Sequence, residues 1–211
     1  GLICSTEPLA SIDNDRLYQL EHILPVMERK VEVRNLFGEC RFPNMADIYL
    51  PEKKWHSFVL INWNDETEIP AAFQLTEKTI SGLKKDRVYL VAEFYSGCYQ
   101  TDIKYGDTVS MGVILPHGSA VFKIQEYDPA MPFIVKSTAH YSIGGETEVL
   151  KIEKETLIFE MQYLFETESI YHVLLPEGYE TKDHNREVEI HVRKTGRTLI
   201  EIPIQEIHKN T

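Results

Sequence analysis

The chain has 211 residues, of which 43% are hydrophobic, so it can bury one large core or two small ones and is not expected to be disordered. Its 33 acidic and 22 basic side chains give a formal net charge of −11. The longest basic runs are dipeptides, which argues against nucleic acid as a partner, because phosphate neutralisation needs clustered lysine and arginine. No segment approaches about 18 consecutive apolar residues, so no membrane span is predicted.

The first predicted element is a short helix near the N-terminus. Leu17, Leu20, Leu24 and Met27 recur at helical spacing, and Pro25 disfavours helical geometry at the residue before it. A helix of about three turns is marginal alone in water, so its apolar stripe must pack on another part of the fold.

Alternating and apolar runs rich in β-branched and aromatic residues then occur at intervals of about ten residues, which is typical of an antiparallel β-sandwich. The predicted strands are 31–37, 46–50, 56–63, 69–75, 88–95, 99–104, 108–115 and 119–125. The prolines of the segment 127–132 then interrupt the pattern. Six further strands are predicted at 133–138, 148–152, 156–164, 169–175, 188–192 and 198–204.

The predicted fold class is therefore all-β: an antiparallel β-sandwich with a short N-terminal helix, followed by a second, smaller β-sandwich-like domain. The expected divisions are residues 1–30 for the helix and linker, 31–127 for the sandwich and 128–211 for the second domain. Two turns carry specific expectations. Lys194-Thr195-Gly196 is expected to separate two strands, and Gly118 is expected to take a positive φ in the turn that starts at Pro116.

No catalytic or metal-binding residue is predicted. The three cysteines are an odd number without a CxxC pair, and the histidines at 172, 184 and 191 lack the spacing of metal ligands. The acidic pairs Asp65-Glu66 and Asp102/Asp107 are interpreted as turn residues rather than as the paired acids of a glycosidase. No cofactor is implied.

Exposed aromatic rings are the remaining candidates for ligand contact, since a flat ring can stack on the apolar face of a sugar. Trp55, Tyr95, Tyr99 and Tyr105 lie at predicted strand ends or turns, where their rings are expected to stay exposed. Trp63 lies inside a predicted strand and is expected in the core. The four ring residues are therefore the candidate carbohydrate contacts.

Four segments resemble the C-terminal part of α-galactosidase-like (melibiase-type) glycoside hydrolases. Residues 14–20 (NDRLYQL) with Leu24-Pro25 are similar to the end of the last barrel helix in that family. Residues 59–65 (VLINWND) and 113–121 (VILPHGSAV) resemble the first and last parts of its β-sandwich, and residues 137–145 (STAHYSIGG) resemble a segment found after the sandwich in some members. The resemblance covers roughly residues 17–146.

The resemblance implies a non-catalytic accessory region that packs on a catalytic barrel expected upstream of residue 1. It carries over no catalytic residue, because the family's catalytic aspartates stand on barrel strands that have no counterpart here. The parent protein is expected to be a glycoside hydrolase, and carbohydrate is a possible partner. Two alternatives stay open: a carbohydrate-binding module, and a pair of Ig-like surface or adhesion domains.

Overall fold

The computed structural model describes residue 14 and residues 22–23, 29–36 and 42–207, and these form an all-β fold of antiparallel strands, as predicted. Within the predicted N-terminal helix, Asn14, His22 and Ile23 are described, and all three are helical. The rest of that helix lies outside the described residues, as do Cys4 and Cys40.

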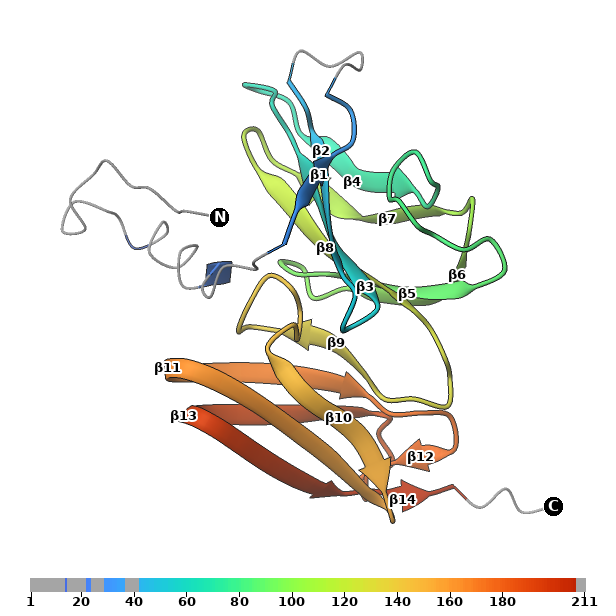
Figure 1. Ribbon diagram of the computed structural model, residues 1–211, viewed down its shortest axis with the longest axis vertical. Helices are drawn as coiled ribbons and strands as arrows, with labels where there is room; N and C mark the ends of the chain where they lie inside the picture. Colours follow the sequence, from blue (N-terminus) through green and yellow to red (C-terminus); the bar gives the residue numbers. More distant parts are fainter. Residues whose placement is uncertain (1–13, 15–21, 24–28, 37–41, 208–211) are drawn as a thin grey trace.

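A six-stranded sheet, called the central sheet below, has the strand order β1-β2-β3-β8-β5-β6 (Figure 1). Two further strands, β4 and β7, pair with each other beside it. The bounds are β1 (Val31–Val33), β2 (Met45–Leu50), β3 (Trp55–Ile61), β4 (Ile69–Gln74), β5 (Val88–Glu93), β6 (Tyr99–Lys104), β7 (Thr108–Ile114) and β8 (Ser119–Glu126).

Both faces of the central sheet are buried at β5 and β8. On one face Val91 and Phe122 join the core that this sheet shares with β4 and β7. On the other face Leu90, Ala92 and Val121 join a second core, which extends into the C-terminal strands. The strands therefore stack as three layers, with the central sheet in the middle.

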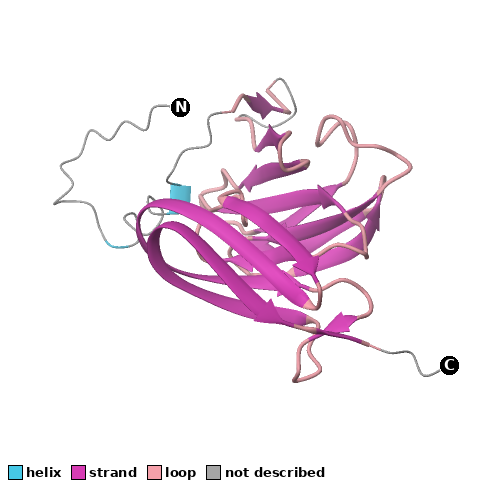
Figure 2. Ribbon diagram, turned by 60° about the horizontal axis from the view of Figure 1, so that its bottom comes forward, coloured by secondary structure: helices cyan, strands magenta, loops and turns pink. Residues whose placement is uncertain are grey.

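The C-terminal sheet is built on one long hairpin. Its strands are β9 (Phe133–Ser137), β10 (Thr147–Glu153), β11 (Thr156–Leu174) and β13 (Glu187–Pro203), and β12 (Tyr179–Glu180) pairs separately with β14 (Gln205–Glu206). β13 pairs along β11, while β10 and β9 pair with the first and last parts of β11. β10 and β9 therefore share one edge of β11, and the long strands curve strongly (Figure 2).

The predicted turn at Lys194-Thr195-Gly196 is wrong, because β13 runs through it and β11 likewise joins two predicted strands. The register between β11 and β13 shifts between Tyr163 and Thr167, and Gly196, opposite Tyr163, has a φ of +73°. A glycine with positive φ produces a bulge in a strand as readily as a turn between strands. The sequence signal was therefore real, but it marks a bend in a continuous hairpin.

The turn between β7 and β8 also differs from its prediction. His117, not Gly118, has the positive φ, at +56°, and the Gly118 amide donates a hydrogen bond to the Leu115 carbonyl at 2.9 Å. Proline followed by a residue with positive φ and closed by this bond is the pattern of a type II turn. Glycine still suits position 118, because a Cβ there would make a tight contact of 3.0 Å with the Leu115 carbonyl oxygen.

The predicted division between residues 127 and 128 falls in the loop from β8 to β9. The second core crosses this point, since it combines Leu90 and Phe94 of the first part with Phe159 and Tyr171 of the second. The two parts therefore share buried surface, and the division into domains stays a prediction.

The loop before β10 depends on Gly144. Its φ is +97°, and an added Cβ would lie 2.5 Å from the Ile134 Cδ1 atom. We expect Gly144→Ala to lower the free energy of unfolding by about 1–3 kcal/mol, measured by urea denaturation. Gly178→Ala is the matched control, because Gly178 has a φ of +91° but open space around it. An equal loss in both variants would assign the cost to the backbone conformation alone.

Candidate functional site

Trp55 is not an exposed ring, so the expectation for this residue is wrong: its side chain is only 6% exposed. β3 lies between β2 and β8, and Trp55 pairs with Leu50 on one side and Gln125 on the other. The Lys123 ammonium lies over the indole, 4.0 Å from the ring centroid. Trp55 is thus covered in part by Lys123, which the pairing of β3 with β8 brings beside it from a distant part of the chain.

The three tyrosines lie in separate surroundings. Tyr95 is 48% exposed, and its hydroxyl donates to that of Tyr141 at 3.2 Å. The half-buried Tyr99 donates to the Glu187 carboxylate at 3.3 Å, and burial raises the pKa of its phenol.

Tyr105 is also half-buried, and its hydroxyl accepts a hydrogen bond from the Glu77 amide at 3.3 Å. The structure therefore does not bring the four candidates together. Trp63, expected in the core, is 48% exposed, and its indole N–H donates to the Pro43 carbonyl at 2.7 Å, because β3 ends at Ile61.

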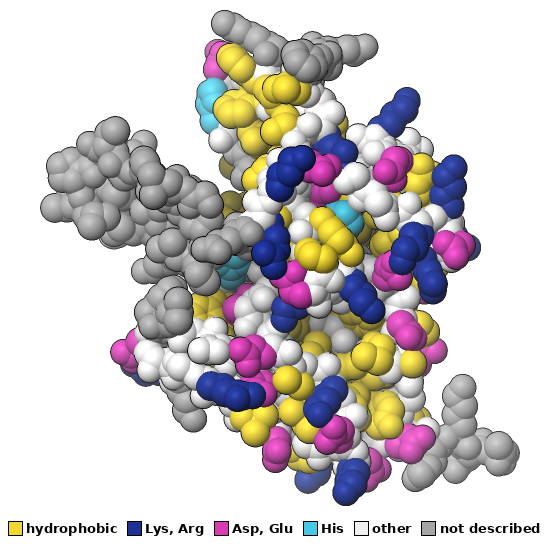
Figure 3. Space-filling model, viewed as in Figure 1, with side chains coloured by type: hydrophobic (Ala, Val, Ile, Leu, Met, Phe, Trp, Pro, Cys, Tyr) yellow, Lys and Arg dark blue, Asp and Glu magenta, His cyan; other side chains and the backbone are white. Residues whose placement is uncertain are grey.

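Trp55 instead lines a pocket of about 460 Å³ between the central sheet and the C-terminal strands, called the interlayer pocket below. Trp55, Lys123 and Gln125 line it from the central sheet, and Phe133 and Thr147 from β9 and β10. None of the three candidate tyrosines lines it. The surface of the molecule is hollowed at this junction (Figure 3).

Lys123 is the most unusual residue of this pocket, because it is only 1% exposed. Its ammonium donates to the Ile134 carbonyl at 2.9 Å and to the Ile143 carbonyl at 3.3 Å, which fastens β9 and the following loop to β8. Burial lowers its pKa from the ordinary 10.5 to about 7, although the Glu146 carboxylate acts in the opposite direction. Sequence reasoning missed it, although a lysine between Phe122 and Ile124 in an apolar strand was a visible signal.

Glu146 joins a buried polar network near Lys123. The Tyr171 hydroxyl donates to Glu146 Oε1 at 2.7 Å, and the Ser142 hydroxyl lies 3.4 Å from Oε2. The Nδ1 atom of His140 accepts a hydrogen bond from the Ser142 amide at 3.1 Å. Burial, followed by the charge of Glu146, raises the pKa of the Tyr171 phenol. This network orders the loop between β9 and β10.

Three polar side-chain atoms of the interlayer pocket have no hydrogen-bond partner although each is buried. They are the Trp55 Nε1 donor, the Gln125 Oε1 acceptor and the Thr147 Oγ1 hydroxyl. Buried polar groups in proteins are nearly always paired with protein, water or ligand. Each of the three atoms has less than 1 Å² of accessible surface although its residue lines the pocket, so leaving it unpaired is a cost of the packing around the pocket.

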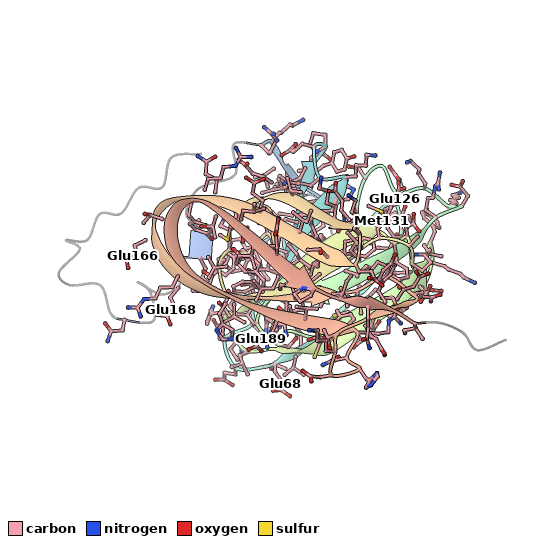
Figure 4. All side chains as sticks on the ribbon, turned by 90° about the horizontal axis from the view of Figure 1, so that it is seen from below. Glu68, Glu126, Met131, Glu166, Glu168 and Glu189 are labelled. Carbon is pink, nitrogen blue, oxygen red and sulfur yellow. The ribbon has the colours of Figure 1, made fainter. Side chains whose placement is uncertain are left out.

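The rim of the pocket carries charges of both signs. Acidic residues are Glu52, Glu126, Asp128 and Glu148, and the basic ones are Lys53 and Lys54. Figure 4 shows Glu126 and Met131 close together at this rim, far from Glu166 and Glu168 on the bend of the long hairpin. Burial also lowers the pKa of Lys53, whose ammonium donates to the Thr147 carbonyl.

A second buried charged group, missed by sequence reasoning, lies on β2 and β3. The Asp47 carboxylate is 1% exposed, and its oxygens lie 3.0 and 3.1 Å from His56 Nδ1. The Arg34 guanidinium approaches the same carboxylate at 3.7 Å. His56 and Arg34 thus lie against the buried carboxylate of Asp47, and these contacts include no nucleophilic side chain.

One acid of each pair and the three histidines singled out in the sequence have local partners. Asp65 pairs with His117 at 3.1 Å, and Asp107 accepts the Lys104 amide at 2.8 Å. His172 and His191 both pair with Glu189, at 3.5 and 2.5 Å, and His184 pairs with Glu180 at 2.6 Å. Within the described part of the chain, no group of three or more His, Cys, Asp or Glu residues is arranged to hold a metal ion.

Comparison with known proteins found no family model and no curated protein that matches this chain. Among the residues that the structure describes, no helix has the length and apolar character needed to cross a membrane.

Proposed function

We propose that the chain is a non-catalytic accessory β region of a glycoside hydrolase of the α-galactosidase-like type, which packs on and supports a catalytic barrel on its N-terminal side. The observation that carries this proposal is the contact between the segments that resemble that family. The side-chain amide of Asn62, from the segment 59–65, donates to the Ile114 carbonyl at 3.0 Å and to the Leu115 carbonyl at 3.1 Å. Both carbonyls belong to the segment 113–121.

The segment 137–145 is linked both to β8 and to the N-terminal residues. Lys123, shortly after the segment 113–121, donates to the Ile143 carbonyl. His140 Nε2 lies 3.1 Å from the Ile23 carbonyl, and the Tyr141 amide donates to the His22 carbonyl at 3.1 Å. His22 and Ile23, which lie between residues 14–20 and Leu24-Pro25, are thus held against the β layers. Such an anchor would fix a preceding domain relative to the sandwich.

The buried carboxylates support a non-catalytic role. Asp47 pairs with His56, Glu160 pairs with Arg197, and Glu93 accepts the Ser96 amide at 2.6 Å and the Val121 amide at 3.3 Å. Glycoside hydrolysis needs two acids that face each other across the scissile bond. The three carboxylates lie on different strands, and each already pairs with a different partner inside the fold.

The test is a turnover assay of the chain on a panel of p-nitrophenyl glycosides, which includes the α-galactoside. We expect no release of nitrophenol above the protein-free blank. Glu93 is the internal control, because it is the buried acid that lines a second pocket, of about 450 Å³. Turnover that disappears in Glu93→Gln would overturn the non-catalytic assignment. If the coding sequence on the N-terminal side encodes no barrel, the proposed partner domain does not exist.

A further inference from the structure

The pocket that Glu93 lines has a volume of about 450 Å³ and is called the Glu93 pocket below. It is formed where the end of β5 and the start of β8 meet the last residues of β7, with Met111 and Val113 of β7 and Ser119 and Ala120 of β8 among its lining. We propose that this pocket binds an organic cation with an aliphatic body, such as a primary alkylammonium. The inference rests on this pocket alone and does not depend on the proposed function.

Glu93 supplies the negative charge of the pocket. It is only 3% exposed, and its carboxylate accepts hydrogen bonds from the backbone amides of Ser96 at 2.6 Å and Val121 at 3.3 Å. Both partners are uncharged, and no ion pair with Glu93 occurs among the described residues. Glutamate is seldom buried without a paired charge. A cation in the pocket would supply that charge without touching the carboxylate oxygens, because charges attract each other over several ångströms where water is excluded.

The other lining residues provide no positive charge that would repel a cation. Among the described residues that line the pocket there is no lysine or arginine. His117 lines it, but its Nε2 atom lies 3.1 Å from the Asp65 carboxylate, which balances any charge that the imidazole gains. An anion would face the charge of Glu93 with no compensating group. The charges of the pocket therefore favour a cation over an anion.

Exposed apolar side chains define the rest of the ligand. Tyr95, Val113 and Leu115 all line the pocket, and they are 48%, 58% and 63% exposed. Exposed apolar side chains that gather at one place on a surface mark a binding site. Val113 and Leu115 can cover an alkyl chain, and the face of the Tyr95 ring can attract an ammonium group. An inorganic cation would use the charge of the pocket and leave these side chains uncovered.

A titration followed by proton–nitrogen correlation NMR tests the proposal. The probe is n-butylammonium chloride, and the backbone amides of Gly112 and Ala120 report on the pocket. We expect their signals to shift and saturate, with a dissociation constant on the order of 1 mM. Three control compounds at the same ionic strength should produce no saturable shift. Butanol lacks the charge, sodium butyrate reverses it, and ammonium chloride lacks the alkyl chain.

A second probe distinguishes two sources of the same chemistry. Nα-acetyl-lysine methylamide carries the ammonium on the side chain that a partner protein would present, whereas n-butylammonium represents a free amine. Saturation by either probe supports the proposal, and the probe that binds more tightly identifies the source.

The matched variants are Glu93→Gln and Glu160→Gln. Both remove the charge of a buried carboxylate at nearly constant volume, but Glu160 lies on β11, outside the pocket. Glu93→Gln should weaken binding of the probe about tenfold, and Glu160→Gln should leave it unchanged.

A second pair of variants keeps the test valid if Glu93→Gln does not fold. Val113→Lys brings a tethered ammonium to the pocket at an exposed position and should abolish the saturable shift. Val33→Lys makes the same change at an exposed residue outside the pocket and should have no effect on binding.

Three results would overturn the proposal. They are no saturable shift up to the solubility of the two probes, saturation by one of the three control compounds, or equal affinity within either pair of variants. Each measures binding and not bond cleavage, so it is independent of the turnover assay. A pocket that binds no cation would leave the accessory role intact.

Discussion

Asn62→Ala is expected to lower the free energy of unfolding by about 2–4 kcal/mol. The Asn62 side chain is 1% exposed, and its amide nitrogen donates to the carbonyls of Thr67, Ile114 and Leu115 at 2.8, 3.0 and 3.1 Å. Alanine leaves these carbonyls without this donor in a place that water does not readily reach. The loop after β3 and the end of β7 would lose the residue that joins them. Urea denaturation of the purified chain measures the change.

Asn64→Ala is the control for this experiment. Asn64 is exposed, and its side chain donates to Asn62 Oδ1 at 2.8 Å without bonding the three carbonyls. We expect a loss below about 1 kcal/mol, as for most surface substitutions. Equal losses at the two positions would mean that the loop, and not the amide of Asn62, holds the strands together.

Lys123→Met is expected to change how stability depends on pH. Burial lowers the pKa of Lys123 to about 7, whereas the unfolded chain has the ordinary value of 10.5. Between these values the unfolded state binds more protons than the folded state, so the free energy of unfolding rises with pH. The destabilising contribution of Lys123 is complete below about pH 7 and is gone above about pH 10.5. The methionine variant lacks this contribution at every pH.

The measurement is the difference in unfolding free energy between wild type and Lys123→Met from pH 7 to pH 10. The free energy of unfolding of wild type should rise, relative to that of the variant, by up to about 1.4 kcal/mol per pH unit. Methionine also leaves the carbonyls of Ile134 and Ile143 without their donor, which is a loss that does not depend on pH. Lys78→Met, at an exposed lysine, should show no such slope. A flat difference for Lys123→Met would show that the ammonium keeps its proton throughout the range.

The strands were predictable from the sequence because most of them alternate or form short apolar runs. The bounds predicted for β6 agree with the structure, where its burial alternates residue by residue. The 19-residue β11 was divided into two predicted strands, because its irregular centre interrupts the alternation. The two-residue strands β12 and β14 are too short to leave a periodic signal.

The candidate site was predictable only in part. Trp55 was selected from the sequence, but as an exposed ring, since its position at the start of a strand resembles an edge. Whether it is covered depends on the pairing of β3 with β8, which is distant in the chain. Thr147 was missed for the same reason, because the pocket exists only where the C-terminal strands meet the central sheet, whereas Lys123 had a local signal, its place between Phe122 and Ile124, that was overlooked. Pairing between distant strands is not encoded in local periodicity.

The burial of both faces of the central sheet has a consequence for how this sequence can diverge among related proteins. In β5 the residues from Tyr89 to Glu93 are all buried. In β6 partly buried positions alternate with exposed ones. A polar replacement would therefore be tolerated at alternate positions of β6 but at few positions of β5. Relatives that have drifted far from this chain should retain the hydrophobic run of β5 longer than any single surface strand.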